Sequence, residues 1–160
     1  MEIEVFDNFF STNTKLEIFN LLQRPKWSFT GGGDYNKFWH MDGLENEEYF
    51  TSFIFDQICE KLGRSFRYLR IYANGQTSGQ CGVPHTDDGD FTFLYYHNLK
   101  WRTEYQGHLM FLDSKEIFRT VAYKPNRAVL FPAKIKHYAD APARLFSGLR
   151  ISLAYKLELL

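Results

Sequence analysis

The sequence lacks several features that mark common functional classes. Its two cysteines, Cys59 and Cys81, are too few for a disulfide framework, and 19 basic residues balance 19 acidic ones without forming a basic tract. A neutral chain offers no electrostatic reason to expect nucleic acid or an anionic membrane as a partner. No apolar run approaches the ~18 residues that a membrane-spanning helix needs. The chain starts with acidic residues, unlike a signal peptide, so we expect a soluble cytoplasmic protein.

The composition is globular and rich in aromatic residues. Of the 160 residues, 44% are hydrophobic, 18% are aromatic and only 24% carry a charge. This length fits one domain, and abundant Phe and Tyr favour β-strands. We therefore expect a single domain over residues 1–160, with helical support in 1–63 and a β-rich core in 64–160.

The first part of the chain has the apolar spacing of two helices. The segment "KLEIFNLLQ" carries a helical stripe that Ser11 or Thr12 can cap at its start. A second helical pattern follows Asn46, a candidate N-cap, and ends where Gly63 provides a C-terminal glycine. Between them, "TGGGDYN" is expected to be a flexible loop.

After the second helix the pattern changes to short β-rich runs bounded by Gly, Pro, Asn or Asp. These runs are "RYLRIYANG", "FTFLYYHNL", "GHLMFLD", "TVAYKP", "RAVLFP" and "GLRISLAYKLELL". Helices followed by about six strands indicate a mainly β domain with flanking helices. Strands of this kind close most easily as a sandwich or a jelly roll.

The stretch "VPHTDDGDF" holds a candidate metal site. If it is extended, His85 and Asp87 point to the same face, because alternate side chains of a strand share a face. One imidazole and one carboxylate suit divalent iron when a second histidine completes a 2-His-1-carboxylate triad. His137 has the best context for that ligand, since it follows the strand and turn of "RAVLFPAKIKH". Taken alone, His-x-Asp is more typical of a polar turn than of a metal site.

The other histidines have no comparable setting. We expect His40, His97 and His108 to lie on the surface or to serve as hydrogen-bonded structural residues.

The last run, "GLRISLAYKL", has two contrasting faces. Leu149, Ile151, Leu153, Tyr155 and Leu157 form the apolar face, and the opposite face carries Arg150, Ser152, Ala154 and Lys156. A planar guanidinium beside a hydroxyl suits a bound carboxylate, although a surface salt bridge is the alternative. Tyr72 and Tyr96, on two other runs, can each direct a phenol into the same cavity or serve only in packing.

Residues 66–157 resemble the iron(II)- and 2-oxoglutarate-dependent dioxygenases, in particular their prolyl 4-hydroxylase-like branch. The resemblance rests on the order of "RIYANGQTSGQCGVPHTD", "FTFLYYHNLKW", "GHLMFLD", "KPNRAVLFP", "KIKHYADAP" and "LRISLAYKL". It implies a double-stranded β-helix, which is a cupin-like jelly roll, with supporting helices. Two departures are His108, where the family usually has a second glycine, and Arg144, which rivals Arg150 by its distance from His137.

The resemblance also implies roles for individual residues. His85, Asp87 and His137 would bind Fe(II), and Arg150 would pair with the distal carboxylate of 2-oxoglutarate. Three further residues, Ser152, Tyr72 and Tyr96, would help to hold that cosubstrate. We prefer Arg150 to Arg144 because Arg150 lies in an alternating strand, whereas Arg144 follows "DAPA" in an expected loop.

The activity implied is hydroxylation of an unactivated C–H bond. O2 and 2-oxoglutarate would be consumed, succinate and CO2 released, and ascorbate is a candidate reductant. The substrate would be a prolyl residue in a peptide or protein, or alternatively a free amino acid or other small metabolite. Segments 30–42 and 97–106 are expected to border its entrance. A cupin-like protein that binds a metal or small ligand without oxidising anything remains a competing interpretation. The sequence makes no prediction of oligomeric state.

Overall fold

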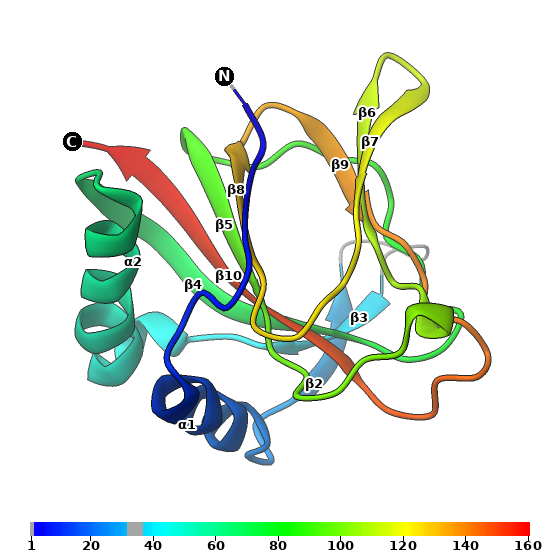
Figure 1. The fold of residues 1–160 in the computed structure, drawn as a ribbon, viewed down its shortest axis with the longest axis horizontal. Helices are drawn as coiled ribbons and strands as arrows, with labels where there is room; N and C mark the ends of the chain where they lie inside the picture. The colour runs from blue at the N-terminus through cyan, green and yellow to red at the C-terminus, as the bar shows by residue number, and fades with distance from the viewer. Residues whose placement is uncertain (1, 32–36) are drawn as a thin grey trace.

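Two antiparallel sheets face each other, and the two helices cover the outer side of the larger sheet (Figure 1). The computed structural model describes residues 2–31 and 37–160, and no helix among them is long and apolar enough to cross a membrane. In spatial order the larger sheet contains β1 (Glu4–Phe6), β8 (Ala128–Pro132), β5 (Phe91–Tyr96), β10 (Arg150–Leu159), β4 (Phe66–Gln76), β3 (Lys37–Met41) and β2 (Ser28–Gly31). The smaller sheet contains β7 (Glu116–Val121), β6 (Leu109–Asp113) and β9 (Lys136–Ala139).

The predicted fold class, a mainly β jelly roll with flanking helices, is confirmed. Strand β10 lies at the centre of the larger sheet, where it pairs with β4 on one side and β5 on the other. The segment expected to be helical support, 1–63, also contributes β1, β2 and β3 to this sheet. Residues 30 and 31 of the expected loop "TGGGDYN" therefore belong to β2, which pairs with β3. Residues 32–36 lie outside the described chain.

The first helix begins as predicted and the second does not. In α1 (Thr12–Leu22), the Ser11 hydroxyl accepts a hydrogen bond from the Thr14 amide. Asn46 is not an N-cap, because Gly43, with φ of 76°, begins a short 3-10 helix at Leu44–Asn46.

The second helix then follows this 3-10 segment. A π-helical turn at Tyr49–Ile54 leads into α2 (Phe55–Leu62), and Gly63 ends it in the left-handed conformation as predicted. A third short segment, the 3-10 helix at Thr103–Tyr105, lies between β5 and β6.

Two of the observed strands differ from the expectation. Strand β7 begins four residues before "TVAYKP", and its side chains are mostly exposed, so it carries little apolar signal. Strand β9 was not predicted at all, because its four residues, "KHYA", are mostly polar. This strand carries His137, one of the candidate metal ligands.

Apolar residues fill both sides of the larger sheet. On the helical side, Ile151, Leu153 and Tyr155 of β10 pack with residues such as Ile18 and Ile54 of the helical segments. Between the two sheets, a smaller cluster contains Ile3, Tyr96, Leu109, Phe111, Val121, Tyr123, Val129 and Phe131. This second cluster fills only part of the space between the sheets, and polar side chains line the rest.

Candidate metal and cosubstrate site

The segment that carries His85 and Asp87 is held against β9 by backbone hydrogen bonds. His85 and His137 exchange two such bonds, of 3.0 and 2.9 Å, and the Asp87 amide donates to Ala133 at 2.8 Å. His85 is thus an isolated bridge residue and not part of a continuous strand, which corrects the expectation of a strand here. The pairing with β9 still directs both side chains toward His137.

Gly89 lets the chain turn directly after these residues. Its φ is 80°, and a Cβ at this position would lie 2.6 Å from the Leu157 carbonyl oxygen. The next amide, of Asp90, donates to that same carbonyl. Glycine is therefore needed for the segment to join β10 so closely. Asp88, by contrast, is largely exposed, and its Oδ2 lies 3.7 Å from Arg70 Nη2, so Asp87 is the acid that faces the two histidines.

His85, Asp87 and His137 come together as predicted. One ligand atom from each lies within 4.8 Å of the other two. His85 Nε2 is 3.5 Å from Asp87 Oδ1, and His137 Nε2 is 3.2 Å from Asp87 Oδ2. Asp87 and His137 are buried, whereas the His85 side chain is half exposed. The site is therefore open on the His85 side.

Both imidazoles are oriented as metal ligands require. Each Nδ1 lies 2.8 Å from a backbone carbonyl two residues earlier, Val83 for His85 and Ile135 for His137. A carbonyl oxygen can only accept, so each Nδ1 must donate, and Nε2 is the atom left to face Asp87 or a metal. Two imidazole nitrogens and one carboxylate form a donor set that fits Fe(II).

The charges around the carboxylate keep it ionised. Although burial alone would raise the pKa of Asp87, hydrogen bonds with His137 and His85 and the charge of Lys156 hold that pKa well below its usual range. The same contact with Asp87 raises the pKa of His85 above its ordinary value, against the opposing effect of burial.

Arg150 is a fully buried cation, at 1% exposure, on the wall of a cavity between the two sheets. Its Nε donates to the Gly107 carbonyl at 2.7 Å, and Nη1 donates to Gln76 Oε1 at 2.9 Å. Burial lowers its pKa from the usual value. None of these partners is a carboxylate, so the guanidinium charge is unpaired among the described residues. An unpaired buried cation favours an anionic ligand.

The other predicted cosubstrate residues lie around the same cavity. Ser152 and Tyr72 line it directly. Tyr96 is not among the lining residues, but its ring lies 5.5 Å from the Arg150 guanidinium carbon. Its buried hydroxyl has no hydrogen-bond partner in the described part of the chain, and burial raises its pKa to about 12. This hydroxyl is therefore neutral, and it is carried by a ring that lies beside Arg150.

Four polar residues at the site were not predicted to act there. Asn74 and Gln76 line the cavity two and four residues after Tyr72 on β4, and Asn74 Oδ1 is buried without a partner among the described residues. Thr92 donates to Asp87 Oδ2 at 2.6 Å, and Lys156 contacts the same oxygen. Strand alternation was the available signal, since these residues share faces with Tyr72, Tyr96 and Arg150.

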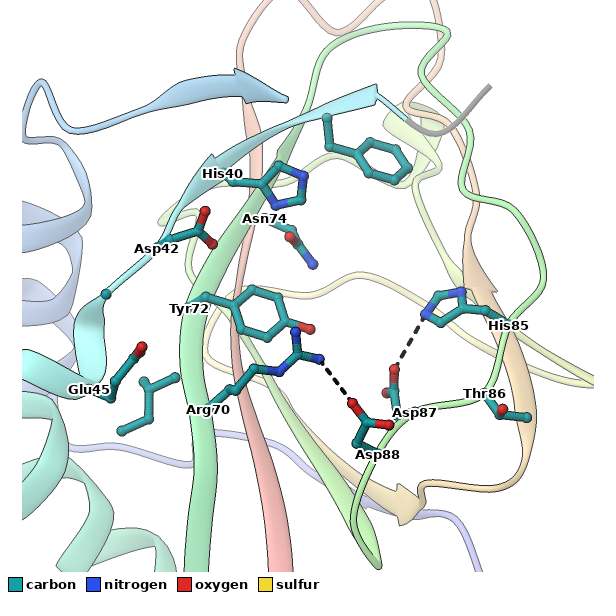
Figure 2. A pocket seen from close by; sticks show the side chains of 13 residues that line it. His40, Asp42, Glu45, Arg70, Tyr72, Asn74, His85, Thr86, Asp87 and Asp88 are labelled. Carbon is teal, nitrogen blue, oxygen red and sulfur yellow. Dashed lines mark ion pairs between the residues drawn. The ribbon is translucent and has the colours of Figure 1, made fainter. Parts of the chain in front are cut away.

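A second, wider cavity of about 600 Å³ opens on the exposed side of His85. Figure 2 shows His85 and Asp87 on one wall of it, with Tyr72 and Asn74 opposite. Its other lining residues are largely polar, and they include His40, Asp42, Glu45 and Arg70.

This outer pocket bears on the expected substrate entrance. Segment 30–42 borders it through Phe38, His40 and Asp42. Segment 97–106 lines neither this pocket nor the inner cavity. Instead, the Trp101 ring packs against Tyr123 and Phe146.

The remaining candidates lie outside the site. His97 is buried, and its Nε2 is 3.3 Å from the Phe19 carbonyl, as expected of a structural residue. His108 Nδ1 accepts a hydrogen bond from the Tyr123 amide. Arg144 is exposed in a turn and lines neither cavity, so Arg150 is the arginine at the site.

Comparison with known sequences gives no match, either to a protein-family model or to a curated protein. Comparison with solved structures gives clear matches. The Pseudomonas putida prolyl-4-hydroxylase has a TM-score of 0.76 and 12% identity, covering 99% of this chain and 92% of that one. A prolyl hydroxylase from Trichoplax adhaerens, solved with a hypoxia inducible factor peptide fragment, has a TM-score of 0.71 and 18% identity, covering 97% and 82%.

A third similar structure was solved with ligands. HygX from Streptomyces hygroscopicus, with nickel and 2-oxoglutarate bound, has a TM-score of 0.74 and 11% identity, covering 96% of this chain and 81% of that one. The chain therefore has the fold of the 2-oxoglutarate and iron(II) oxygenases. Identities this low establish the fold, and function has to be argued from the residues of the site.

Proposed function

We propose that this chain is an iron(II)- and 2-oxoglutarate-dependent dioxygenase that hydroxylates an unactivated C–H bond. One observation carries the proposal: a buried, carboxylate-free Arg150 lines the same cavity as two residues of the triad, His85 and His137. A metal site alone would not need this cation. A metal site beside a buried cation suits a ligand that has a chelating end and a distal carboxylate, which describes 2-oxoglutarate.

Each residue has a defined task in this proposal. His85, Asp87 and His137 hold the Fe(II) ion, with the Nδ1 hydrogen bonds fixing both imidazole rings. Arg150 binds the distal carboxylate of 2-oxoglutarate, and Ser152 and the Tyr96 hydroxyl support that carboxylate. Tyr72 lines the cavity along the length of the cosubstrate.

When bound, Fe(II), 2-oxoglutarate and O2 supply an oxidant that converts a C–H bond into C–OH, while the 2-oxoglutarate becomes succinate and CO2. The protein contributes geometry and a water-poor cavity for the cosubstrate. It also leaves the half-exposed His85 side open, so that a substrate in the outer pocket can reach the metal. Ascorbate would serve as the external reductant that keeps the iron divalent.

The substrate is a peptide or a small molecule. The outer pocket is open and polar, and it is large enough for an extended segment or a metabolite. One similar structure holds a hypoxia inducible factor peptide, and another, HygX, holds hygromycin B. A prolyl residue in a peptide is the first substrate to test, with free amino acids and other small metabolites next. We expect the protein to act in the cytoplasm.

The test is release of succinate from 2-oxoglutarate by purified protein with Fe(II), ascorbate and a panel of proline-containing peptides, amino acids and small metabolites. We expect turnover in the wild type and none in His85→Ala or Asp87→Ala. Asp113→Ala, an exposed acid at the end of β6, is the matched control and should keep wild-type turnover. Equal turnover in the triad variants would contradict the proposal. A non-oxidising cupin-like protein would bind metal and release no succinate.

A further inference from the structure

Lys156 is a second buried cation at this site, and the proposed function gives it no task. It lies on β10 at 2% exposure and lines the inner cavity together with Arg150. Lysine is rarely buried without a partner of opposite charge. Here the partner is the candidate metal ligand itself, because Asp87 is the one carboxylate that Lys156 contacts among the described residues.

The contacts of Asp87 divide its two carboxylate oxygens. Oδ2 accepts hydrogen bonds from Thr92 Oγ1, at 2.6 Å, and from the Lys156 ammonium, which also lies 3.3 Å from Thr92 Oγ1. A carboxylate oxygen has two lone pairs, so these two donors use the capacity of Oδ2. Oδ1 has only His85 Nε2 nearby, at 3.5 Å. His137 Nε2 also lies 3.2 Å from Oδ2, so a metal held by His137 and Asp87 would meet the oxygen that Lys156 already contacts.

This arrangement places a positive charge beside the metal position. A divalent ion held by His85, Asp87 and His137 and the Lys156 ammonium would both draw on the same carboxylate charge. Like charges repel more strongly inside a protein than in water. Lys156 should therefore weaken binding of the metal alone. Lys156 should strengthen binding of a dianionic cosubstrate in the same cavity, because Lys156 and Arg150 both attract it.

We propose that Lys156 couples the two ligands: its ammonium competes with the metal for Asp87 and attracts 2-oxoglutarate, so that the metal binds well only when the cosubstrate is present. The inference rests on the proposed function, because it takes 2-oxoglutarate as the second ligand. Lys156 is a positioning residue in this scheme, since it acts on the metal through Asp87. Coupling between two binding sites is reciprocal, so the metal should tighten 2-oxoglutarate binding by the same factor.

The experiment measures Mn²⁺ affinity of the metal-free protein with and without saturating 2-oxoglutarate, by electron paramagnetic resonance of free Mn²⁺. In the wild type, 2-oxoglutarate should tighten Mn²⁺ binding by about tenfold or more. In Lys156→Met, Mn²⁺ alone should bind about tenfold more tightly than in the wild type, and 2-oxoglutarate should tighten Mn²⁺ binding less than in the wild type, by the share that its own chelation of the metal provides. A residue needed only for folding would not tighten metal binding when it is removed.

Two further variants keep the test decisive. Lys134→Met is the matched control: the Lys134 ammonium lies 3.0 Å from the Asp87 backbone carbonyl, and the residue is exposed, so wild-type coupling should remain. Lys156→Gln keeps a hydrogen-bond donor without the charge. It should show the tighter Mn²⁺ binding and the smaller effect of 2-oxoglutarate that we expect of Lys156→Met, and it serves as the test if the methionine variant does not fold.

Two results would overturn the inference. One is weaker Mn²⁺ binding without 2-oxoglutarate in the Lys156 variants, and the other is wild-type coupling in them. Either leaves the proposed function intact, provided that wild-type protein binds both ligands. If the wild type binds neither Mn²⁺ nor 2-oxoglutarate, the proposed function fails and this inference fails with it.

Discussion

The two faces of β10 have opposite roles although their residues alternate along one strand. Ile151, Leu153 and Tyr155 face the helices and belong to the main hydrophobic cluster. Ser152 and Lys156 face the inner cavity, together with Arg150 at the start of the strand. Both faces are buried, so burial alone does not distinguish core from site.

The two faces differ in what their side chains contact. The side chains of the apolar face contact one another and the helices, so this face needs no partner from outside the protein. The polar face carries two cations but contacts one carboxylate in the described chain, that of Asp87. Burying charge without full compensation costs stability, so a protein keeps such a face when a ligand completes it. Substitutions on the two faces should therefore separate stability from ligand binding.

The largest effect on stability is expected for Leu153→Ala. Leu153 is fully buried between the sheet and the helices, and truncation would leave a cavity. Such truncations cost about 3 kcal/mol or more of unfolding free energy. Urea denaturation should show this loss while 2-oxoglutarate affinity of the folded variant stays unchanged. Ser152→Ala, one residue away on the other face, should show the reverse pattern. Equal losses of stability in the two variants would contradict the division between the faces.

The next effect concerns ligand binding and is expected for Arg150→Met. Losing the charge-assisted contact to the distal carboxylate should weaken 2-oxoglutarate binding by about 100-fold, or about 3 kcal/mol, in the presence of Mn²⁺. Isothermal titration calorimetry measures this change. Arg144→Met is the matched control, because Arg144 is exposed in a turn away from the cavity. If Arg144→Met lost affinity and Arg150→Met kept it, the roles of the two arginines would be exchanged.

Much of this division could be predicted from the sequence, because alternation in a central strand assigns each residue to a face. Alternation gave correct expectations for β10, and the capping preferences of Ser11 and Gly63 correctly predicted the start of one helix and the end of the other. Strands β7 and β9 were misplaced or missed because their side chains are exposed or polar, and pairing with β6 is what orders them. The prediction of Asn46 as an N-cap was wrong, because Gly43 starts an irregular 3-10 segment that no periodic pattern reveals.

The site was predictable where its residues matched a motif, and it was not where only tertiary contacts create a role. His85, Asp87 and His137 converge as expected, although a bridge to β9 rather than a strand brings them together. Lys156 was assigned to the polar face, yet its contact with Asp87 depends on how the 83–90 segment crosses β10. The Thr92 contact with Asp87 arises in the same way.

The smallest effect on stability is expected for Tyr155→Phe. Tyr155 carries a polar atom on the apolar face, so this variant tests whether that face is independent of the cavity. The Tyr155 hydroxyl donates to the Phe50 carbonyl at 2.8 Å, so the helical side satisfies this donor without any ligand. Tyr155→Phe removes one neutral hydrogen bond and should lower the unfolding free energy by about 1 kcal/mol, as measured by urea denaturation. Affinities for Mn²⁺ and 2-oxoglutarate should stay at wild-type values. A change in either affinity would mean that the helical side is coupled to the cavity through β10, and the two faces would then be parts of one unit.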